Sequence, residues 1–417
     1  MLRIAAAATL ALIAAPALAA EPDGLTLPPG FHAEVVAEAL GPIRHLAVHG
    51  HDLYVSTRHG KDEPSTGIIA LRLGPDHKPV ETTRFSDIDQ GTGIRIHGGA
   101  LYAASATTIY RYKLGDALVP AGPPAVIVDG LAPTTHPIAF DDSGHLYVGI
   151  AGGGGANNCH DPNVPKGEVP VGLKPCPLLE TRGGVWRFAA AKPGQNFSDG
   201  LHFSTGVRDM SAMDWRRSDG LYGAMHGRDG TAATWPQLVT PAQDDNIADE
   251  MHRIGQGTDM GWPYTYWDGA RNIRLTGPEY GGDGKTAVTD ARYSTPVVAF
   301  QPRRPAVLDL AFYQGAAFPA KYRGGAFFAM HGGSGDRSVL PEGRSGYDVV
   351  FVPFVGGKAG TPVEFAGGFA GPSPANRNFG KAAYRPVGVA FGPEGDLYVA
   401  DSNKGRIWRI FYTGKAQ

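Results

Sequence analysis

Ser143-Gly144-His145-Leu146-Tyr147-Val148 is a turn that leads into a β-strand, and variants of this unit occur six times along the chain. Each copy joins an apolar run to a second β-rich run through a Gly-containing turn, which is the pattern of a β-hairpin. The other copies lie at 50–55, 98–103, 219–222, 324–328 and 394–399. Hairpins that recur at this long spacing indicate radial repetition. We therefore predict an all-β fold, a six-bladed β-propeller.

The same repeat predicts where polar side chains gather. Because a hairpin folds back, the residues before its first strand and after its second strand lie at the same end. Before the first strands stand Arg44-His45, Thr135-His136, Arg208-Asp209 and Tyr384-Arg385. After the second strands stand Arg58-His59, His226-Gly227-Arg228-Asp229, His331 and Asp401-Ser402-Asn403. Basic and imidazole groups should therefore converge on one face of the disc, around its axis.

Composition limits the class of protein. The chain has 417 residues, 59 of them Gly and 34 Pro, and 19% are charged, which suits many short strands and turns. A net charge of −2 without a basic run argues against nucleic-acid binding. Residues 1–19 have a basic start, a short apolar run and an Ala-rich cleavage site, which predict a secretory signal peptide. An uncleaved membrane anchor is the alternative, although the run is short for a bilayer span.

Residues 20–417 are predicted to form a single propeller domain, and no other segment is apolar enough to cross a membrane. Long stretches without apolar periodicity at about 151–182 and 229–295 should be loops over the polar face, where lids and binding loops are usually found. The last strand, near 405–410, should close the ring beside an N-terminal strand near 31–36. The predicted location is the periplasm or the exterior of the cell.

Cys159 and Cys176 are the two cysteines of the chain. In an exported protein such a pair favours a disulfide, and two unpaired thiols are the alternative. Cys159-His160 lacks the earlier cysteine of a haem attachment site, and two cysteines cannot form a Cys-rich zinc site.

Three groups of residues on the polar face could carry chemistry. His136 suits a general base, because the ordinary imidazole pKa of about 6.5 lies near neutrality. Arg208 and Arg385 could hold an anionic ligand, with a structural Arg–Asp pair as the alternative. The segment 226–229 followed by Asp249 and Glu250 supplies carbonyl and carboxylate oxygens of the kind that Ca²⁺ prefers, although acidic loops are more often simply solvated.

Several strings resemble the soluble glucose/sorbosone dehydrogenases that depend on pyrroloquinoline quinone (PQQ). They are residues 135–148, Gly206-Val207-Arg208-Asp209, His226-Gly227-Arg228-Asp229, Gly261-Trp262-Pro263-Tyr264 and 385–389. The resemblance covers most of the mature chain in the family's order, and the segments 159–176 and 183–188 look closer to its sorbosone-dehydrogenase branch. It implies a six-bladed propeller that oxidises a sugar, a sugar aldehyde or a related alcohol with PQQ and Ca²⁺.

The resemblance also implies roles for individual residues. His136 would take the substrate hydroxyl proton, and Arg208 and Arg385 would contact PQQ. Further cofactor-binding positions are Asp209, His226 and, more weakly, Arg337. Ca²⁺ would lie beside the carbonyls of Gly227 and Arg228, with Asp249 or Glu250 nearby.

Two departures from the family pattern concern the same site. Asp209 stands where the family commonly has Asn, which would weaken the binding of an anionic cofactor unless a cation compensates. Glycines at 152–155 replace an acidic residue, so the partner that orients His136 is undefined. The competing functions are a Ca²⁺-dependent lactonase and a non-catalytic periplasmic binding module. The expected partners are a small sugar or alcohol and an electron acceptor that the sequence does not identify.

Overall fold

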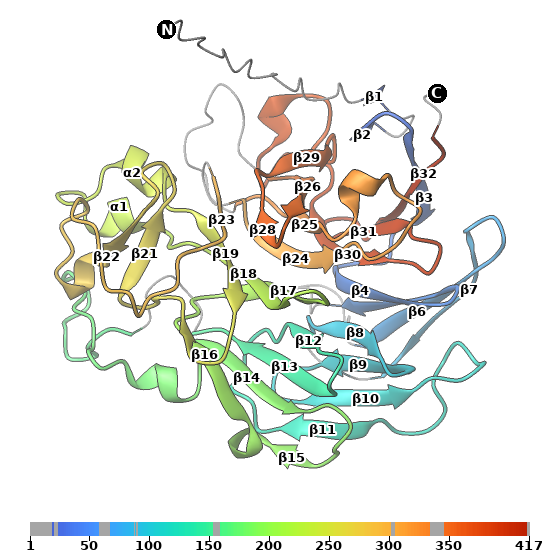
Figure 1. Cartoon of the computed structure of the whole chain (residues 1–417), viewed down its shortest axis with the longest axis horizontal. Coiled ribbons are helices and arrows are strands. Elements are labelled where there is room, and N and C mark those ends of the chain that lie inside the picture. Colours follow the sequence, from blue (N-terminus) through green and yellow to red (C-terminus); the bar gives the residue numbers. More distant parts are fainter. Residues whose placement is uncertain are drawn as a thin grey trace, which may run out of the picture.

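The structure, a computed structural model, describes residues 19–20, 24–57, 67–86, 88, 91–152, 159–301, 305–333 and 346–414. Six sheets, antiparallel except for the edge pairs β11–β15 and β16–β20, are arranged around an axis, and the predicted six-bladed β-propeller is confirmed (Figure 1). The described helices are short: α1 (Thr231–Thr234), α2 (Pro241–Asp245) and five 3₁₀ turns. None of the described helices has the length and apolar character needed to span a membrane.

Blades one to three come from the first half of the chain. Blade one is β4 (Ile43–His49), β5 (Asp52–Thr57), β6 (Ile68–Leu73) and β7 (Pro79–Phe85). Blade two is β8 (Ile94–His97), β9 (Ala100–Ala104), β10 (Ile109–Lys113) and β11 (Ala125–Asp129), with β15 (Gln195–Asn196) at its edge. Blade three is β12 (Ile138–Phe140), β13 (His145–Ile150), β14 (Gly184–Ala189), β16 (Leu201–Thr205) and β20 (Thr258–Asp259).

Blades four to six complete the ring. Blade four is β17 (Met210–Arg216), β18 (Gly220–Met225), β19 (Asp249–Ile254) and β23 (Val298–Phe300). Blade five is β24 (Val307–Phe312), β25 (Ala326–Met330), β26 (Asp348–Val352) and β29 (Val363–Ala366). Blade six is β30 (Pro386–Phe391), β31 (Leu397–Asp401), β32 (Ile407–Tyr412) and β3 (Phe31–Ala37). Small hairpins lie outside the ring: β1 (Ala19–Ala20) with β2 (Thr26–Leu27), β21 (Thr265–Asp268) with β22 (Ile273–Thr276), and β27 (Phe354–Val355) with β28 (Lys358–Ala359).

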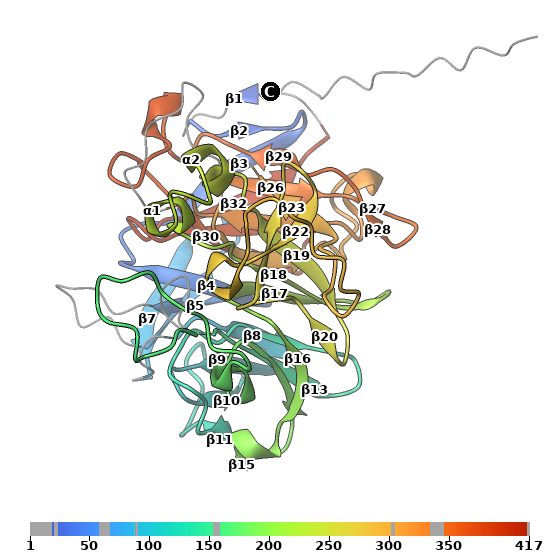
Figure 2. The same cartoon turned by 90° about the vertical axis from the view of Figure 1, so that its left-hand side faces the viewer.

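The innermost strand of each blade contacts those of its two neighbours, in the circular order β4, β8, β12, β17, β24 and β30 (Figure 1). Figure 2 shows the same ring turned by 90°, with β4, β8 and β17 near its middle. The repeated Leu-Tyr-Val motif supplies the second strand of a blade. Leu146 and Val148 are fully buried between sheets, and Gly144 adopts φ +84° in the preceding turn, a conformation that favours glycine. The sequence pattern thus encodes both the turn and the apolar contact between blades.

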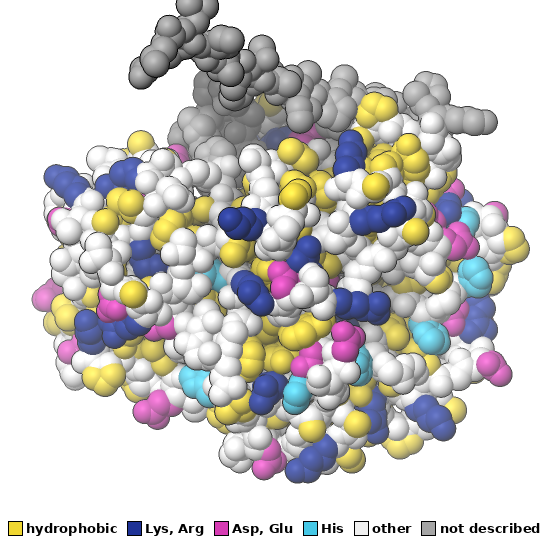
Figure 3. All heavy atoms as spheres, viewed as in Figure 1, with side chains coloured by type: hydrophobic (Ala, Val, Ile, Leu, Met, Phe, Trp, Pro, Cys, Tyr) yellow, Lys and Arg dark blue, Asp and Glu magenta, His cyan; other side chains and the backbone are white. Residues whose placement is uncertain are grey.

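Closure of the ring follows the prediction. The N-terminal β3 pairs antiparallel with the C-terminal β32, with Phe31 opposite Tyr412 and Ala33 opposite Ile410. Blade six therefore combines both ends of the described chain, which removes an open edge from the ring. On the face seen in Figure 3, basic, acidic and histidine side chains alternate with apolar ones, in keeping with a net charge near zero.

Candidate active site

The hairpin ends meet on one face of the disc, as the repeat predicts. In blade four the His226 N–H donates to the Asp209 carbonyl at 2.8 Å, and in blade six the Ser402 N–H donates to the Arg385 carbonyl at 3.1 Å. Contacts between blades run along the same rim. The Gly152 N–H donates to the Arg208 carbonyl at 2.8 Å. We call the rim that carries His136, Arg208, Asp209, His226 and Arg385 the mouth.

Below the mouth, charged side chains from opposite blades meet across the axis. Arg95 of β8 donates to Asp309 of β24 at 2.7 Å, and Asp309 also accepts from the Val389 N–H at 3.0 Å. His45 Nδ1 of blade one lies 3.8 Å from Asp309. Sequence reasoning missed Arg95 and Asp309; the available signal was a charged residue inside an otherwise apolar inner strand. This buried network links four blades beneath the mouth.

Asp209 and His226 form the ion pair of the mouth. His226 Nδ1 lies 3.5 Å from Asp209 Oδ2, and the side chains are 14% and 39% exposed, respectively. Burial acts to lower the pKa of His226, but the hydrogen bond to Asp209 and its charge raise it to about 9. Burial likewise acts to raise the pKa of Asp209, but His226, Arg208 and Arg44 together bring it below its ordinary value. At neutral pH the pair is therefore an imidazolium beside a carboxylate that solvent reaches.

Asp209→Asn should lower the His226 pKa from about 9, because the hydrogen bond and the charge that oppose the effect of burial most strongly are then lost. Since the folded-state pKa is raised, the pair stabilises the fold fully below about pH 6.5, and this contribution disappears as the pH rises through 9. NMR titration of the histidine ring protons checks the shift. A wild-type midpoint for His226 near 6.5 would contradict the ion pair.

His136 is fully buried at the seam between blades two and three. Its Nε2 lies 2.9 Å from the Ala106 carbonyl and its Nδ1 lies 3.1 Å from the Gly149 carbonyl. Burial lowers its pKa despite these carbonyls, so the ring is neutral and can donate to one of them. The backbones at Gly93 and His136 lie very close together, since a Cβ atom added at Gly93 would be 2.2 Å from the His136 carbonyl oxygen. The role of His136 as a base stays a prediction, and this geometry favours a seam contact instead.

Arg208 has one donor group that the described protein does not satisfy. Its two terminal nitrogens bond the Gly227 carbonyl and Asp229, the latter at 2.7 Å. Its Nε is buried and has no hydrogen-bond partner among the described residues. Leaving a buried donor unsatisfied costs about 1–3 kcal/mol, more for a charged group. An anionic ligand in the mouth would remove this cost.

Arg385 is covered by protein. It is 3% exposed, and its guanidinium donates to the His331 carbonyl at 3.0 Å and to the Gly332 carbonyl. The ring of Phe379 lies over it with 4.7 Å between the guanidinium carbon and the ring centroid. Arg337, the weaker candidate, lies outside the described residues.

The residues predicted to hold Ca²⁺ are committed to other partners. Asp249 and Glu250 are consecutive in β19, so their side chains face opposite sides of the strand. Asp249 accepts from the Gly227 N–H at 2.9 Å, whereas Glu250 accepts from Arg274 at 3.0 Å and lies 3.1 Å from His252. The Arg228 guanidinium binds both oxygens of Glu279 at 2.8 Å. Within the described ranges, no three His, Cys, Asp or Glu side chains cluster as metal ligands, and the predicted Ca²⁺ site, which relies on backbone carbonyls, stays a prediction.

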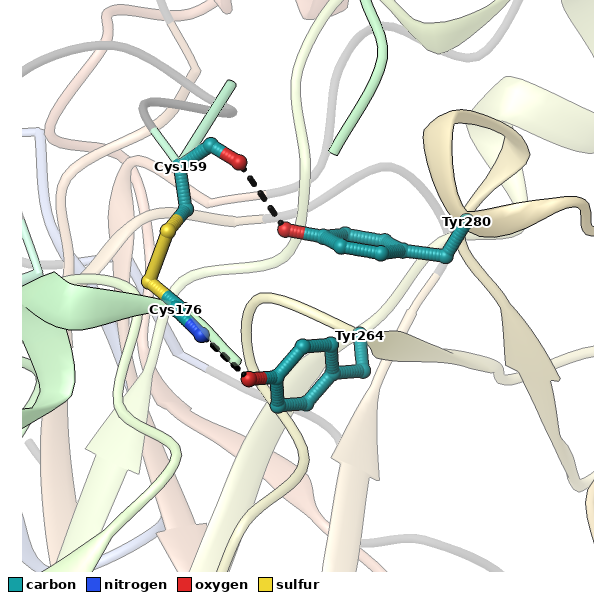
Figure 4. Close-up of a disulfide and its surroundings, with 4 residues drawn as sticks. All are labelled: Cys159, Cys176, Tyr264 and Tyr280. Carbon is teal, nitrogen blue, oxygen red and sulfur yellow. Dashed lines mark hydrogen bonds between the residues drawn. A yellow bond between two sulfur atoms is a disulfide. The ribbon is translucent and has the colours of Figure 1, made fainter. Parts of the chain in front are cut away.

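The predicted disulfide between Cys159 and Cys176 is confirmed. Two tyrosines from the other long loop fasten it (Figure 4): Tyr280 donates to the Cys159 carbonyl at 3.1 Å, and the Cys176 N–H donates to the Tyr264 hydroxyl at 2.7 Å. The two regions predicted as loops therefore pack against each other. The prediction was wrong for part of 229–295, because that region contains β19 of blade four and the hairpin of β21 and β22. The glycines at 153–155 lie outside the described residues.

Titration of the denatured, unreduced protein should find no free thiol, and reduction should release two. Replacing both cysteines by Ser should lower the free energy of unfolding by about 3 kcal/mol, because the bond closes a loop with a sequence separation of 17 residues. Thiol titration and urea denaturation check these values. Two reactive thiols before reduction would contradict the bond.

Solved structures share this fold. The holo form of the PQQ domain of pyranose dehydrogenase from Coprinopsis cinerea is 17% identical at a TM-score of 0.72, with 94% of this chain and 98% of that chain covered. The calcium structure of the Trichoderma reesei family AA12 enzyme is 18% identical at a TM-score of 0.71, covering 96% and 98%. The PQQ-bound aldose sugar dehydrogenase from Streptomyces coelicolor is 17% identical at a TM-score of 0.56, covering 93% and 100%.

No curated protein matches the sequence. Two of these structural neighbours, from Coprinopsis cinerea and Streptomyces coelicolor, are sugar dehydrogenases solved with PQQ or with a PQQ domain, and none of the three singles out the sorbosone-dehydrogenase branch. The TrAA12-like family matches residues 25–413, and the chain belongs to that family.

Proposed function

We propose that the protein is a quinoprotein oxidoreductase that oxidises a sugar with PQQ bound in the mouth. The observation that carries the proposal is the buried, unsatisfied Nε of Arg208 beside the Asp209–His226 pair. Membership of the TrAA12-like family and the PQQ-containing structural neighbours support it.

The donor set of the mouth suits an anionic ligand. Arg208, the His226 imidazolium and Arg44 supply positive charge there, which Asp209 and Asp229 offset in part. PQQ carries carboxylates, which hydrogen-bond well to guanidinium and imidazolium groups. Arg208 and His226 would therefore hold its carboxylates, and Arg385 would join them once Phe379 uncovers it. When bound, PQQ supplies the quinone that accepts a hydride from the substrate carbon.

The hydroxyl proton of the substrate needs an acceptor within hydrogen-bond reach. Asp209 is anionic and 39% exposed, whereas His136 is fully buried with both ring nitrogens on carbonyls. We assign the acceptor role to the Asp209 carboxylate. His226 would limit its rotation through the ion pair.

The finer features of this proposal come from the sequence. They are a sorbosone- or aldose-type substrate, export through a cleaved signal peptide, a periplasmic location, a separate electron acceptor and a Ca²⁺ requirement. Residues 1–18 lie outside the described residues. Because Asp249 and Glu250 are committed to protein donors, no step here is assigned to Ca²⁺.

Reconstitution tests the function. Purified protein is incubated with PQQ, with and without Ca²⁺, and assayed with aldoses, sorbosone and simple alcohols using an artificial electron-accepting dye. We expect PQQ-dependent dye reduction with at least one sugar. Lactone hydrolysis without quinone, or the absence of both activities from correctly folded protein, would contradict the proposal.

A further inference from the structure

Phe379 is an exposed aromatic residue on an otherwise polar rim. Its side chain is 58% exposed, whereas most large apolar side chains of the described chain are buried. It follows Asn378, which accepts from the Gly380 N–H at 3.0 Å and from the Ala382 N–H at 2.9 Å. The resulting turn points the ring outward. A single exposed aromatic residue is common on a protein surface, so it is the position of the ring beside Arg385 that bears on function.

The inner face of the ring lies on the mouth. The Arg385 guanidinium carbon is 4.7 Å from the ring centroid, and Arg385 itself bonds the His331 carbonyl at the end of blade five. On the same rim, Asn403 donates to the Ala382 carbonyl at 3.1 Å and so fixes the loop that carries Phe379. The aromatic ring of Phe379 therefore lies over the seam of blades five and six, with the Arg385 guanidinium on one face and solvent on the other.

An exposed aromatic ring face favours the binding of a ligand that has a flat apolar face. A pyranose ring has such a face, formed by its axial C–H groups, together with hydroxyls at its edge. The Arg385 guanidinium, which suits a cofactor carboxylate, lies against one face of the Phe379 ring, whereas the other face is exposed to solvent and open to a substrate. Burying apolar area of both partners would favour binding by about tenfold for contact over one ring face.

We propose that Phe379 is the platform on which the pyranose ring of the substrate stacks at the mouth. This inference rests on the proposed function. It makes Phe379 a residue that determines specificity for cyclic sugars over acyclic alcohols. It also couples substrate and cofactor sites, because the same ring covers Arg385.

Steady-state kinetics of the PQQ-loaded enzyme test the proposal with Phe379→Ala and Phe379→Tyr. For a pyranose substrate we expect Phe379→Ala to raise KM about tenfold with kcat within twofold. Phe379→Tyr should retain the wild-type KM, and an acyclic alcohol should show no change. Val355→Ala is the matched control, since Val355 is 79% exposed on the outer hairpin of blade five. PQQ affinity of Phe379→Ala, measured by fluorescence titration, should be equal to that of wild type or higher, because removing the ring uncovers Arg385.

Equal KM values for wild type and Phe379→Ala on every pyranose would overturn the inference while leaving the proposed function intact. A KM increase that is as large for the acyclic alcohol, or weaker PQQ binding in place of a KM effect, would also overturn it. A wild-type enzyme that binds PQQ but oxidises no sugar would overturn the proposed function and the inference together. Saturation-transfer NMR adds a readout without turnover, in which the platform predicts transfer to a pyranose in wild type and its loss in Phe379→Ala.

Discussion

Arg208→Ala should weaken PQQ binding by at least about 100-fold while the propeller stays folded. The substitution removes the buried Nε that has no partner among the described residues, together with the guanidinium charge nearest the Asp209–His226 pair. Truncating one partner of a buried, charge-assisted contact costs about 2–5 kcal/mol, much of it from the charge left behind. Fluorescence titration with PQQ measures the loss of affinity.

Arg216→Ala is the matched control for this result. Arg216 lies at the other end of β17, where it donates to Asp219 at 2.8 Å, outside the mouth. Its replacement should leave PQQ affinity unchanged. Circular dichroism of both variants checks that the fold is kept. Equal PQQ affinities for Arg208→Ala and wild type would show that Arg208 has a structural role only.

Asp209→Asn should lower kcat by about 10²–10⁴-fold, because the partly exposed carboxylate that accepts the substrate proton is lost. Its effect on PQQ binding should be small. The substitution removes the negative charge of Asp209 and also lowers the His226 pKa, so a negative and a positive charge are lost together at neutral pH. Single-turnover kinetics and PQQ titration on the same preparation separate these two effects.

His136→Ala provides the contrast. We expect it to lower the free energy of unfolding by about 2–4 kcal/mol, because a fully buried side chain and its contacts with Ala106 and Gly149 are removed. The kcat of the folded protein should stay within about threefold of wild type, outside the range for loss of a general base. A loss of kcat above 100-fold with unchanged stability would restore His136 as the base and reject Asp209.

The sequence alone determined much of the architecture. The pattern of a Gly turn followed by apolar residues at 143–148 repeats in every blade. Because the reversal of a hairpin is a local property, the sequence alone predicted that the two ends of each hairpin lie on the same face. The pairing of β3 with β32 and the bond between Cys159 and Cys176 were likewise predicted. Both predictions needed only features that are visible in a single sequence, namely one strand pattern near each end of the chain and two cysteines.

The site itself was less predictable, because its properties depend on neighbouring blades. Nothing near His136 in sequence indicates that the Ala106 carbonyl of blade two covers its ring. The sequence suggested that Glu250 could bind a cation. In the structure its carboxylate is instead paired with Arg274, which comes later in the region 229–295. The position of a residue in a strand predicts which face of the propeller it lies near. The exposure of its side chain and its hydrogen-bond partners depend on how all six blades pack.

The most direct test of the central claim is anaerobic single-turnover absorbance of the PQQ-loaded protein mixed with a panel of aldoses and sorbosone, without any dye. A sugar oxidoreductase that uses PQQ in the mouth should convert the bound quinone fully to its reduced form with at least one sugar, and Asp209→Asn should bind PQQ but slow this conversion about 10²–10⁴-fold. Bound PQQ that stays oxidised with every sugar, or protein that binds no PQQ at all, would contradict the account.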